Sequence, residues 1–432
     1  MKPIVSICAF LVLGIHALSQ RTVLLAKNLI DGTGKVIANP AVIISDNKII
    51  AIENKENLHL NKYGNGFVII DLGEYTLLPG MIDAHVHPDN SSDDYQVGHL
   101  RASSAAKTLT GLKAVQDLLS EGWTALRVAG DEDVGYANLE IRNAINNGLF
   151  VGPHIYGAGH YLSVTGGGGD INFISYEQKI IPDGLIVDGP EEIRKAVRTE
   201  IKNGSDWIKI LETGAFMTTG DNPQNVHFSP EELKMAVEEA GRRDVPVMAH
   251  AHATEGIKQA VKAGVRSIEH GSYMDEEAID LMVQHGTYLI PTLTIDLYFK
   301  EKLADSKALA KAIALAKDSR EGMYEKLRLG VKKGLKIGVG TDYIGWPANY
   351  SAREFGELIK IGMSPMQAIQ AGTIVNAQLL NKDKEIGSIE IGKFADIIAV
   401  KGDPLKDISE LQRVKFVMMG GKVVKNEKIK NQ

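Results

Sequence analysis

The chain has 432 residues, of which 44% are hydrophobic, and it contains 44 glycines and 14 prolines, a normal globular composition. This length exceeds one small domain and allows a barrel-sized domain together with a smaller one. The net charge of −6 is modest and Lys and Arg form no run, which argues against a basic surface for nucleic acid.

Residues 1–19 differ in character from everything that follows. Lys2 precedes an uncharged apolar stretch at 3–14, and "ALS" at 17–19 supplies small residues typical of a signal-peptidase site. The stretch is shorter than the roughly 20 apolar residues that span a bilayer, which favours a cleaved signal peptide over a membrane anchor. We therefore expect a secreted or periplasmic protein with no membrane attachment after cleavage.

The same segment holds the only cysteine of the chain, Cys8. Bulky Ile7 precedes it, which does not favour a lipoprotein site. Cleavage would leave a mature protein without disulfides or thiolate ligands. Any metal ion must then be held by His, Asp, Glu or an unusual ligand.

Both ends of the mature chain show the sequence pattern of short strands. "RTVLLAKNLI", "AVIISDNKIIAI" and "GFVIIDLG" are β-branched and separated by Asn, Asp and Gly turns, and "ADIIAVKG" and "VKFVMMGGKVVKN" repeat this texture near the C-terminus. We predict one small β-sandwich domain built from residues 20–78 and 386–432.

Residues 79–385 alternate between expected strands and expected helices. The eight strands cover residues 81–87, 123–130, 152–159, 206–211, 245–252, 265–271, 287–293 and 335–342. Among the helices between them, one begins with a capping box at Ser229, one starts at Thr254 and stops at Gly264, and one starts at Asp275 and stops at Gly286. Eight such units predict an α/β fold, a (β/α)8 TIM barrel.

A doubly wound sheet is the alternative architecture, and it would place a Gly-rich phosphate turn after its first strand. The Gly-rich segment of this chain, "TGGGGD" at 165–170, follows no such turn. We expect it to form a mobile loop over the site instead.

Residues able to bind metal end most of the expected strands. The carboxyl ends of barrel strands meet at one mouth. The residues found at these ends are His85, His87, Lys209, His250, His252, His270 and Asp342. Five of the chain's 12 histidines therefore fall at strand ends, which a scatter of surface histidines would not produce.

The other residues at the strand ends decide how the pair His85 and His87 is interpreted. Two residues apart on a strand, they face the same side and could bind one ion together. Alone, such a pair is more often a pair of packed or hydrogen-bonded histidines. Together with the other strand-end histidines and Asp342 it predicts a metal site, for which Zn²⁺ is best suited and Mn²⁺, Co²⁺ or Fe²⁺ are possible.

Several segments, taken in order, resemble the amidohydrolase superfamily over nearly the whole mature chain. They are "LLPGMIDAHVH", "DWIKI", "MAHAH", "SIEHG", "GVGTD", "MSPMQAIQAGTIVNAQLL" and "GSIEIGKFADIIAVKGDPL". Within it, the chain is most similar to the binuclear, carboxylated-lysine branch of prolidase-like (Xaa-Pro, Xaa-Arg and Xaa-Lys) dipeptidases and carboxypeptidases, which includes the enzyme that hydrolyses the amide of ochratoxin.

The resemblance implies a site with two divalent metal ions, most simply two Zn²⁺. His85, His87 and Asp342 would hold the more buried ion, His250 and His270 the more exposed one, and Lys209 would bridge both as a carbamate formed with CO2. His252 would face the substrate. Two segments depart from the family pattern: Gly168 stands where relatives often have His, and the stretch 212–215 reads "ETGA" where they often read "ATGG". Neither touches the ligands, and both bear on the substrate.

The implied function is hydrolysis of an amide or peptide bond in a dipeptide or N-acyl amino acid, by attack of a metal-bridging hydroxide. Asp342 would accept a proton and pass it to the leaving nitrogen, and His252, Tyr161, Arg127 or Tyr273 could stabilise the oxyanion or a substrate carboxylate. We expect a small-molecule substrate, no nucleic-acid partner and a homo-oligomer.

Three other functions remain as alternatives. A lactonase or phosphotriesterase could use the same metal centre. A nucleobase-type deaminase would use one metal and a general-acid Glu after the fifth strand, where the nearest is Glu255, one turn into a helix. A binding protein without activity would lack a ligand, and the pattern lacks none.

Overall fold

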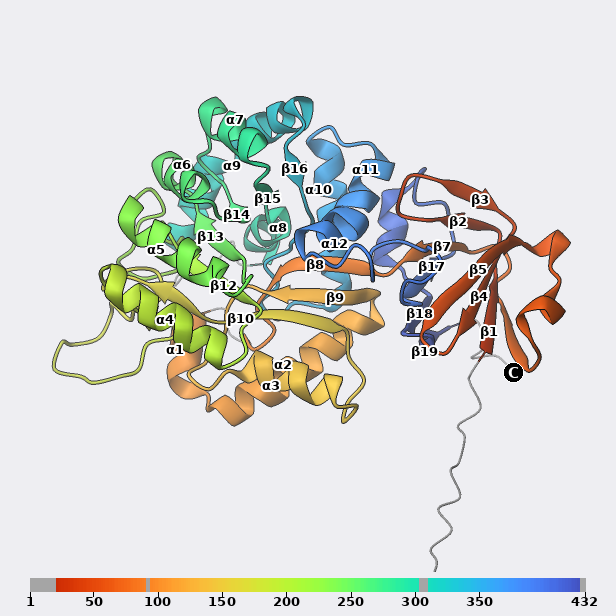
Figure 1. Cartoon of the computed structure of the whole chain (residues 1–432). Coiled ribbons are helices and arrows are strands. Elements are labelled where there is room, and N and C mark those ends of the chain that lie inside the picture. The colour runs from red at the N-terminus through yellow and green to blue at the C-terminus, as the bar shows by residue number, and fades with distance from the viewer. Residues whose placement is uncertain (1–20, 91–93, 303–309, 428–432) are drawn as a thin grey trace, which may run out of the picture.

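The computed structural model describes residues 21–90, 94–302 and 310–427. The predicted signal peptide and Cys8 lie outside these residues. A large α/β body and a smaller β-rich body lie side by side (Figure 1). No helix within the described ranges is long and apolar enough to cross a membrane.

The α/β body is built on one parallel sheet whose eight main strands follow one another in chain order. The strands are β8 (Met81–Val86), β9 (Trp123–Val128), β10 (His154–Ser163), β12 (Trp207–Leu211), β13 (Val247–Ala251), β14 (Ser267–His270), β15 (Tyr288–Ile290) and β16 (Lys336–Ile337). A short strand, β11 (Leu185–Ile186), pairs with β10. This sheet is the one predicted from the eight apolar segments.

Main-chain hydrogen bonds join the first strand of this sheet to the segment that follows the last one. The Ala84 N–H donates to Val339 O (2.9 Å), the Asp342 N–H to His85 O (2.8 Å) and the His87 N–H to Tyr343 O (2.9 Å). The sheet therefore curves until its edges meet, which is consistent with the TIM-like barrel predicted from the sequence.

Helices flank the strands on the outside of the sheet (Figure 1). They include α2 (Ser104–Ser120), α3 (Ala137–Asn146), α4 (Pro190–Lys202), α5 (Pro230–Gly241), α6 (Thr254–Ala263), α7 (Glu276–His285), α9 (Ala310–Lys333), α10 (Glu354–Lys360) and α11 (Pro365–Gln370). The helix α8 (Leu293–Lys302), which follows β15, lies instead beside the carboxyl ends of the strands, where its Ile295 and Phe299 line a cavity. One core of buried apolar side chains from strands and helices fills the space between them. Burial of this apolar surface is the main term that stabilises the body.

The three helix starts and stops predicted from the sequence are confirmed. Ser229 and Glu232 form a reciprocal capping box at the start of α5. The helices α6 and α7 end at Gly264 and Gly286, which adopt the left-handed conformation with φ of 99° and 70°. Glycine suits these positions because it adopts positive φ without a Cβ clash.

The β-rich body contains two sheets made from both ends of the chain. One has the order β5-β4-β1-β6 and the other β19-β18-β17-β7-β2-β3. Their strands are β1 (Arg21–Leu25), β2 (Asn28–Ile30), β3 (Val36–Ala38), β4 (Pro40–Ser45), β5 (Lys48–Asn54), β6 (Phe67–Asp71), β7 (Thr76–Pro79), β17 (Ile397–Val400), β18 (Phe416–Met419) and β19 (Lys422–Asn426). Leu24 and Ile44 of the first sheet share one apolar cluster with Leu77 and Phe416 of the second.

The first segment of this body, "RTVLLAKNLI", contributes to both sheets. It forms β1 and β2, which belong to different sheets. The break follows from hydrogen bonding, because the Ala26 N–H donates to Pro40 O whereas the Lys27 and Asn28 N–H groups donate to Tyr75 O. The β pattern alone does not reveal such a change of partner.

The chain passes from one body to the other at Pro79 and Gly80. Pro79 ends β7, which pairs with β17, and Met81 begins β8. A Cβ atom at Gly80 would lie 2.0 Å from Thr124 Oγ1, so glycine is required for this close approach.

Candidate metal centre

The first cluster of candidate ligands lies at the end of β8. Asp83, His85 and His87 occupy every second position, so their side chains face the same side of the strand. His85 Nε2 and His87 Nε2 lie 3.4 and 3.5 Å from Asp342 Oδ1, which comes from the segment after β16. Ligand atoms of these two histidines and Asp342 all lie within 4.8 Å of one another.

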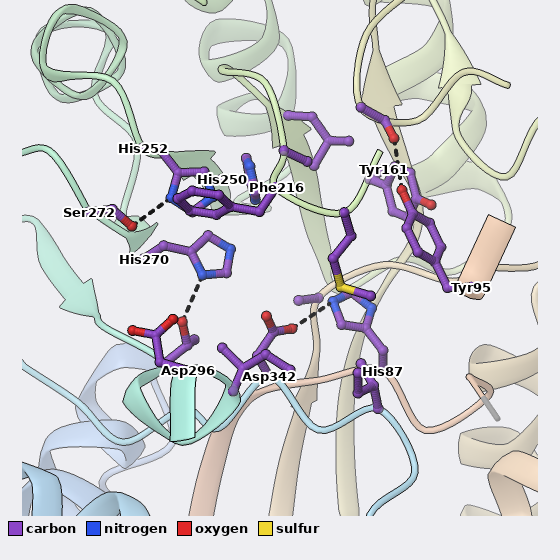
Figure 2. A pocket seen from close by; sticks show the side chains of 18 of the residues that line it. His87, Tyr95, Tyr161, Phe216, His250, His252, His270, Ser272, Asp296 and Asp342 are labelled. Carbon is purple, nitrogen blue, oxygen red and sulfur yellow. Dashed lines mark hydrogen bonds and ion pairs between the residues drawn. The ribbon is translucent and has the colours of Figure 1, made fainter. Parts of the chain in front are cut away.

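A second cluster is formed by His250 of β13, His252 directly after that strand and His270 at the end of β14. Their ring centroids are 4.5 to 4.7 Å apart, and one ligand atom from each lies within 4.8 Å of the others. The cluster adjoins the first, because the ring centroids of His85 and His270 are 5.1 Å apart. Figure 2 shows both groups facing the same cavity.

Two of these residues adopt a backbone conformation that is uncommon outside glycine. His270 has φ of 72° and Asp342 has φ of 58°. The left-handed conformation interrupts the regular alternation of side chains, so His270 turns into the cavity although its neighbour Glu269 also points into the sheet interior. Such strained positions cluster at functional sites, where surrounding structure holds them.

Each histidine ring is oriented by a hydrogen bond at one nitrogen. In four of the rings this nitrogen is Nδ1, and its partners are Glu269 Oε2 for His85 (2.8 Å), Gly130 O for His87 (3.0 Å), Ser272 Oγ for His252 (2.8 Å) and Thr292 Oγ1 for His270 (2.7 Å). In His250 it is Nε2, which lies 3.2 Å from Gly214 O. The other nitrogen of each ring is left for a metal ion, Nδ1 in His250 and Nε2 in the rest. This pairing of ligand and outer partner is the usual arrangement of metal-binding histidines.

Arg127 does not face the substrate, and its candidate role there is wrong. Its side chain is 0% exposed, its Nη2 donates to both oxygens of Glu269 at 2.8 Å, and its Nε donates to Ala84 O at 2.6 Å. Through Glu269 it fixes the ring of His85. A guanidinium suits this place because its several N–H groups serve three partners at once: Nη2 the Glu269 carboxylate, Nη1 the Ser267 hydroxyl at 2.9 Å and Nε the Ala84 carbonyl.

Burial keeps the cluster histidines neutral. It lowers the pKa of His87 and of His252 to about 3, and it lowers those of His250 and His270 well below their usual value. Neutral imidazole is the form that binds a metal ion. The donor set therefore fits divalent cations in its chemistry as well as in its geometry.

Lys209 occupies the space between the two clusters. It is 2% exposed and lines the cavity. Its positive charge adds to burial in lowering the pKa of His87 in one cluster and of His250 and His252 in the other. Burial lowers its pKa to about 8. Within the described part of the chain its Nζ makes no hydrogen bond, so a bridging anion formed on this amine fits the position.

Asp342 stays ionised although its side chain is only 19% exposed. Burial by itself raises the pKa of its carboxyl, but the nearby His85 and His87 outweigh that effect and hold the pKa at about 2. An ionised carboxylate beside the clusters can bind a cation and accept a proton.

A cavity with an enclosed volume of about 120 Å³ opens beside the clusters. Its lining includes Tyr161 and Gly168, as the sequence suggested, and Phe216 and Met217 from the segment after β12. The Tyr161 hydroxyl donates to Asp183, a buried carboxylate. Tyr273, whose ring centroid lies 6.4 Å from that of Phe216, is not among the described residues that line the cavity, so it does not take the place predicted for it beside the substrate.

The two departures from the family pattern meet at one wall of this cavity. A Cβ atom at Gly168 would lie 3.2 Å from Leu211 Cδ1 and 3.4 Å from Ala215 Cβ. A large side chain at 168 would therefore have to displace these neighbours. Both departures shape the substrate cavity. The expectation that neither segment touches the candidate ligands is wrong for 212–215, because Gly214 O lies 3.2 Å from His250 Nε2 and Thr213 Oγ1 accepts from the His252 N–H at 2.9 Å.

Sequence reasoning missed two acidic residues of this site. Glu269 orients His85 from 184 positions away, and Glu132 lines the cavity next to Tyr95 and Tyr161. Glu269 stands beside His270 in "SIEH", yet regular strand alternation would have placed the two on opposite faces. The left-handed conformation of His270 removes that signal.

A parallel α/β sheet with two His-rich clusters and a cavity at the carboxyl ends of its strands defines a class of protein, the metal-dependent hydrolases. A model of the Amidohydrolase family matches residues 76–424. The ochratoxinase of Aspergillus niger is 35% identical to the chain, with 94% of this chain and 86% of that protein covered.

Solved structures agree with this match. A Xaa-Pro dipeptidase with methionine bound in its active site has a TM-score of 0.87 and 34% identity, and a prolidase complexed with N-methylphosphonate-L-proline has a TM-score of 0.86 and 30% identity. Both comparisons cover 94% of this chain and 100% of the other. The chain belongs to the amidohydrolase family and is a hydrolase that acts on C–N bonds.

Proposed function

We propose that the chain hydrolyses the amide bond of a dipeptide or an N-acyl amino acid at a site that holds two divalent metal ions. His85, His87 and Asp342 would hold one ion, His250 and His270 the other, and Lys209 would bridge them as a carbamate. The observation that carries this proposal is the pair of adjoining His clusters with the buried amine of Lys209 between them.

The ions, when bound, supply an acidified water and polarise the carbonyl of the substrate. Asp342 is the group of the chain that can accept a proton there, since its carboxyl is ionised and it lies at the junction of the clusters. It can then return this proton to the nitrogen of the leaving amine, which needs it to depart. One carboxylate therefore serves both halves of the reaction.

His252 would face the substrate. Its Nδ1 is hydrogen-bonded to Ser272, and its ring stacks edge-on against Phe216 at 4.5 Å between centroids. These contacts hold Nε2 toward the cavity, where it can donate to or accept from the substrate. Its ring also lies beside the rings of His250 and His270, so a substrate bound to His252 would lie next to the second ion.

The relatives support an amide as substrate. One is an ochratoxinase and others are a Xaa-Pro dipeptidase and a prolidase. We further infer a complete (β/α)8 barrel with a β-sandwich built from both termini, bounded as the sequence predicts. Secretion to the periplasm or the exterior and a homo-oligomeric state complete the proposal.

Asp342→Asn tests the proposed mechanism directly. We expect turnover of a dipeptide or N-acyl amino acid, found by screening the Zn²⁺-loaded protein against libraries of both, to fall by at least about 1,000-fold, because no other ionised carboxylate of the clusters can move the proton. Metal analysis should find ions retained. Normal hydrolysis by this variant would refute the role of Asp342, and a wild-type protein inactive on every amide would refute the proposed function.

A further inference from the structure

The cavity beside the clusters has two unlike walls. One wall is apolar and comes from the segments after β15 and β16 and from α8, with Pro291, Ile295, Phe299 and Ile344. The other comes from the segment after β9, from β10 and from α1 (Tyr95–Arg101), with Glu132, Tyr161 and Tyr95. In Figure 2, Tyr95 and Tyr161 lie on the side of the cavity away from Asp296 of α8.

Glu132 is the charged residue of the second wall. It is 8% exposed. Its negative charge adds to burial in raising the pKa of Tyr95 and of Tyr161, and the charge of Asp342 in turn adds to the raised pKa of Glu132. The Glu132 carboxyl therefore lies near these three side chains. Its main chain is held firmly, since its N–H donates to Asp89 Oδ2 at 3.0 Å and its carbonyl oxygen accepts from Lys107 Nζ. No side chain in the described ranges donates a hydrogen bond to the Glu132 carboxylate.

This lack of a donor sets Glu132 apart from the acids around it. Asp89 and Asp131 accept from Asn138, Asp133 accepts from Ser104, and Asp183 accepts from Tyr161 and Gln96. The nearby cation, Lys107, is 3.9 Å from Asp133 and is engaged with the Glu132 carbonyl. A buried acidic group without a partner is costly unless a ligand supplies one.

Positive charge is scarce in the same lining. Among the residues that line the cavity in the described part of the chain, Lys209 is the single Lys or Arg. Conversion of Lys209 to a carbamate would remove that cation. The charged residues that then line the cavity outside the metal clusters, Glu132 and Asp296, are both acidic, so they favour a positively charged group of the substrate over a negatively charged one.

We propose that Glu132 binds a protonated amine of the substrate and thereby selects amides that carry a free ammonium group. This inference rests on the proposed function, because it takes the amide to be cleaved at the His clusters. Within the protein alone, burial, with Asp89 and Asp183, raises the pKa of the Glu132 carboxyl well above its usual value. An ammonium group would supply the missing counter-charge in a charge-assisted hydrogen bond.

The ammonium could belong to either half of the substrate, and two matched pairs distinguish these sources. L-Leucyl-L-phenylalanine and 4-methylpentanoyl-L-phenylalanine differ only in the α-ammonium on the acyl side. 4-Methylpentanoyl-L-lysine and 4-methylpentanoyl-L-norleucine differ only in the ammonium on the leaving side. We expect the metal-loaded wild-type protein to prefer the amine-bearing member of one pair at least tenfold in kcat/KM.

Glu132→Gln is the variant that tests the contact. We expect it to lower kcat/KM at least tenfold for the preferred amine-bearing substrate, through KM, and to leave its amine-free partner and the bound metal unchanged. Glu140→Gln, on the exposed face of α3, is the matched control. If Glu132 instead acted as a neutral acid that donates a hydrogen bond, Gln would replace it without loss, which would overturn the proposal.

A binding measurement separates failure of this inference from failure of the proposed function. Calorimetry would compare L-leucinamide with 4-methylpentanamide, and L-lysine amide blocked at its α-amine with the matching norleucine amide, on metal-loaded wild-type and Glu132→Gln protein. Tighter binding of an amine-bearing probe that Glu132→Gln abolishes would support the inference even if no amide were cleaved. Cleavage with no preference in either pair would overturn the inference and leave the proposed function standing.

Discussion

Lys209 shows how the surroundings of a single residue set its chemistry. Between apolar neighbours in "WIKIL" and with 2% exposure, its ammonium loses hydration, and its pKa falls to about 8. An amine with that pKa is partly neutral near pH 7, and the neutral amine is the form that reacts with CO2. The same burial that makes a charged lysine unfavourable here thus favours a carbamate.

We expect Lys209→Ala to lose bound metal and to lower kcat/KM by at least about 100-fold, since even loss of an outer partner of a metal site costs about 10- to 100-fold. Short-chain carboxylic acids such as acetate or propionate should restore part of both, because a carboxylate can occupy the space of the carbamate. Metal analysis and a titration with the acids measure this, with Lys202→Ala on exposed α4 as control. Full activity without added acid would exclude the carbamate.

At the scale of elements, one side chain joins the two edges of the parallel sheet. Asn376, at the start of α12 (Asn376–Leu379), donates from Nδ2 to Ile82 O of β8 at 2.8 Å and to Val339 O at 2.7 Å. The Asp83 carboxylate adds to this seam, since it accepts from the Thr341 N–H at 3.0 Å and from its hydroxyl at 2.6 Å. His85 and Asp342, which face each other in the first cluster, lie directly beside this seam.

We expect Asn376→Ala to lower the free energy of unfolding by about 1–3 kcal/mol, because it removes two buried hydrogen bonds, to Ile82 O and to Val339 O, although Val339 O still accepts from the Ala84 N–H. Urea unfolding measures the change. Gln378→Ala, two residues further on and exposed, should change stability by less than about 0.5 kcal/mol. Equal effects of the two substitutions would mean that the seam contributes nothing beyond helix propensity.

At the scale of the whole molecule, the candidate metal ligands reduce the stability of the metal-free folded state at acidic pH. Histidines His87, His250, His252 and His270 are buried with folded-state pKa values far below the 6.5 of the free side chain, about 3 for His87 and His252. Between pH 6.5 and 3 the unfolded chain therefore binds more protons than the folded one. The folded state loses stability as the pH falls through this window.

We expect the metal-free protein, prepared with a chelator, to be less stable at pH 5 than at pH 7, with each such histidine contributing up to about 2 kcal/mol. Added Zn²⁺ should raise the unfolding midpoint at pH 7, because metal binds only the folded site. Urea unfolding at the two pH values, with and without Zn²⁺, measures both effects. Equal stability of the metal-free protein at pH 5 and pH 7 would show that these histidines are not held neutral.

Much of this molecule follows from local patterns in its sequence. The helix limits at Ser229, Gly264 and Gly286 depend on capping chemistry within a few residues, and the shared face of His85 and His87 depends only on the two-residue period of a strand. Apolar strands alternating with amphipathic helices gave the parallel sheet. These features are local, so the sequence by itself determined them.

Only the tertiary structure decided the features that depend on contacts between distant parts of the chain. The change of sheet at Ala26, the hydrogen bond of Glu269 to His85 across 184 positions, and the inward turn of Arg127 depend on which strands become neighbours. The environment of Glu132 depends in the same way on donors that other elements supply to the surrounding acids. The sequence determined which side chains could do chemistry, and folding decided which of them are desolvated together, because burial and partners set their charge.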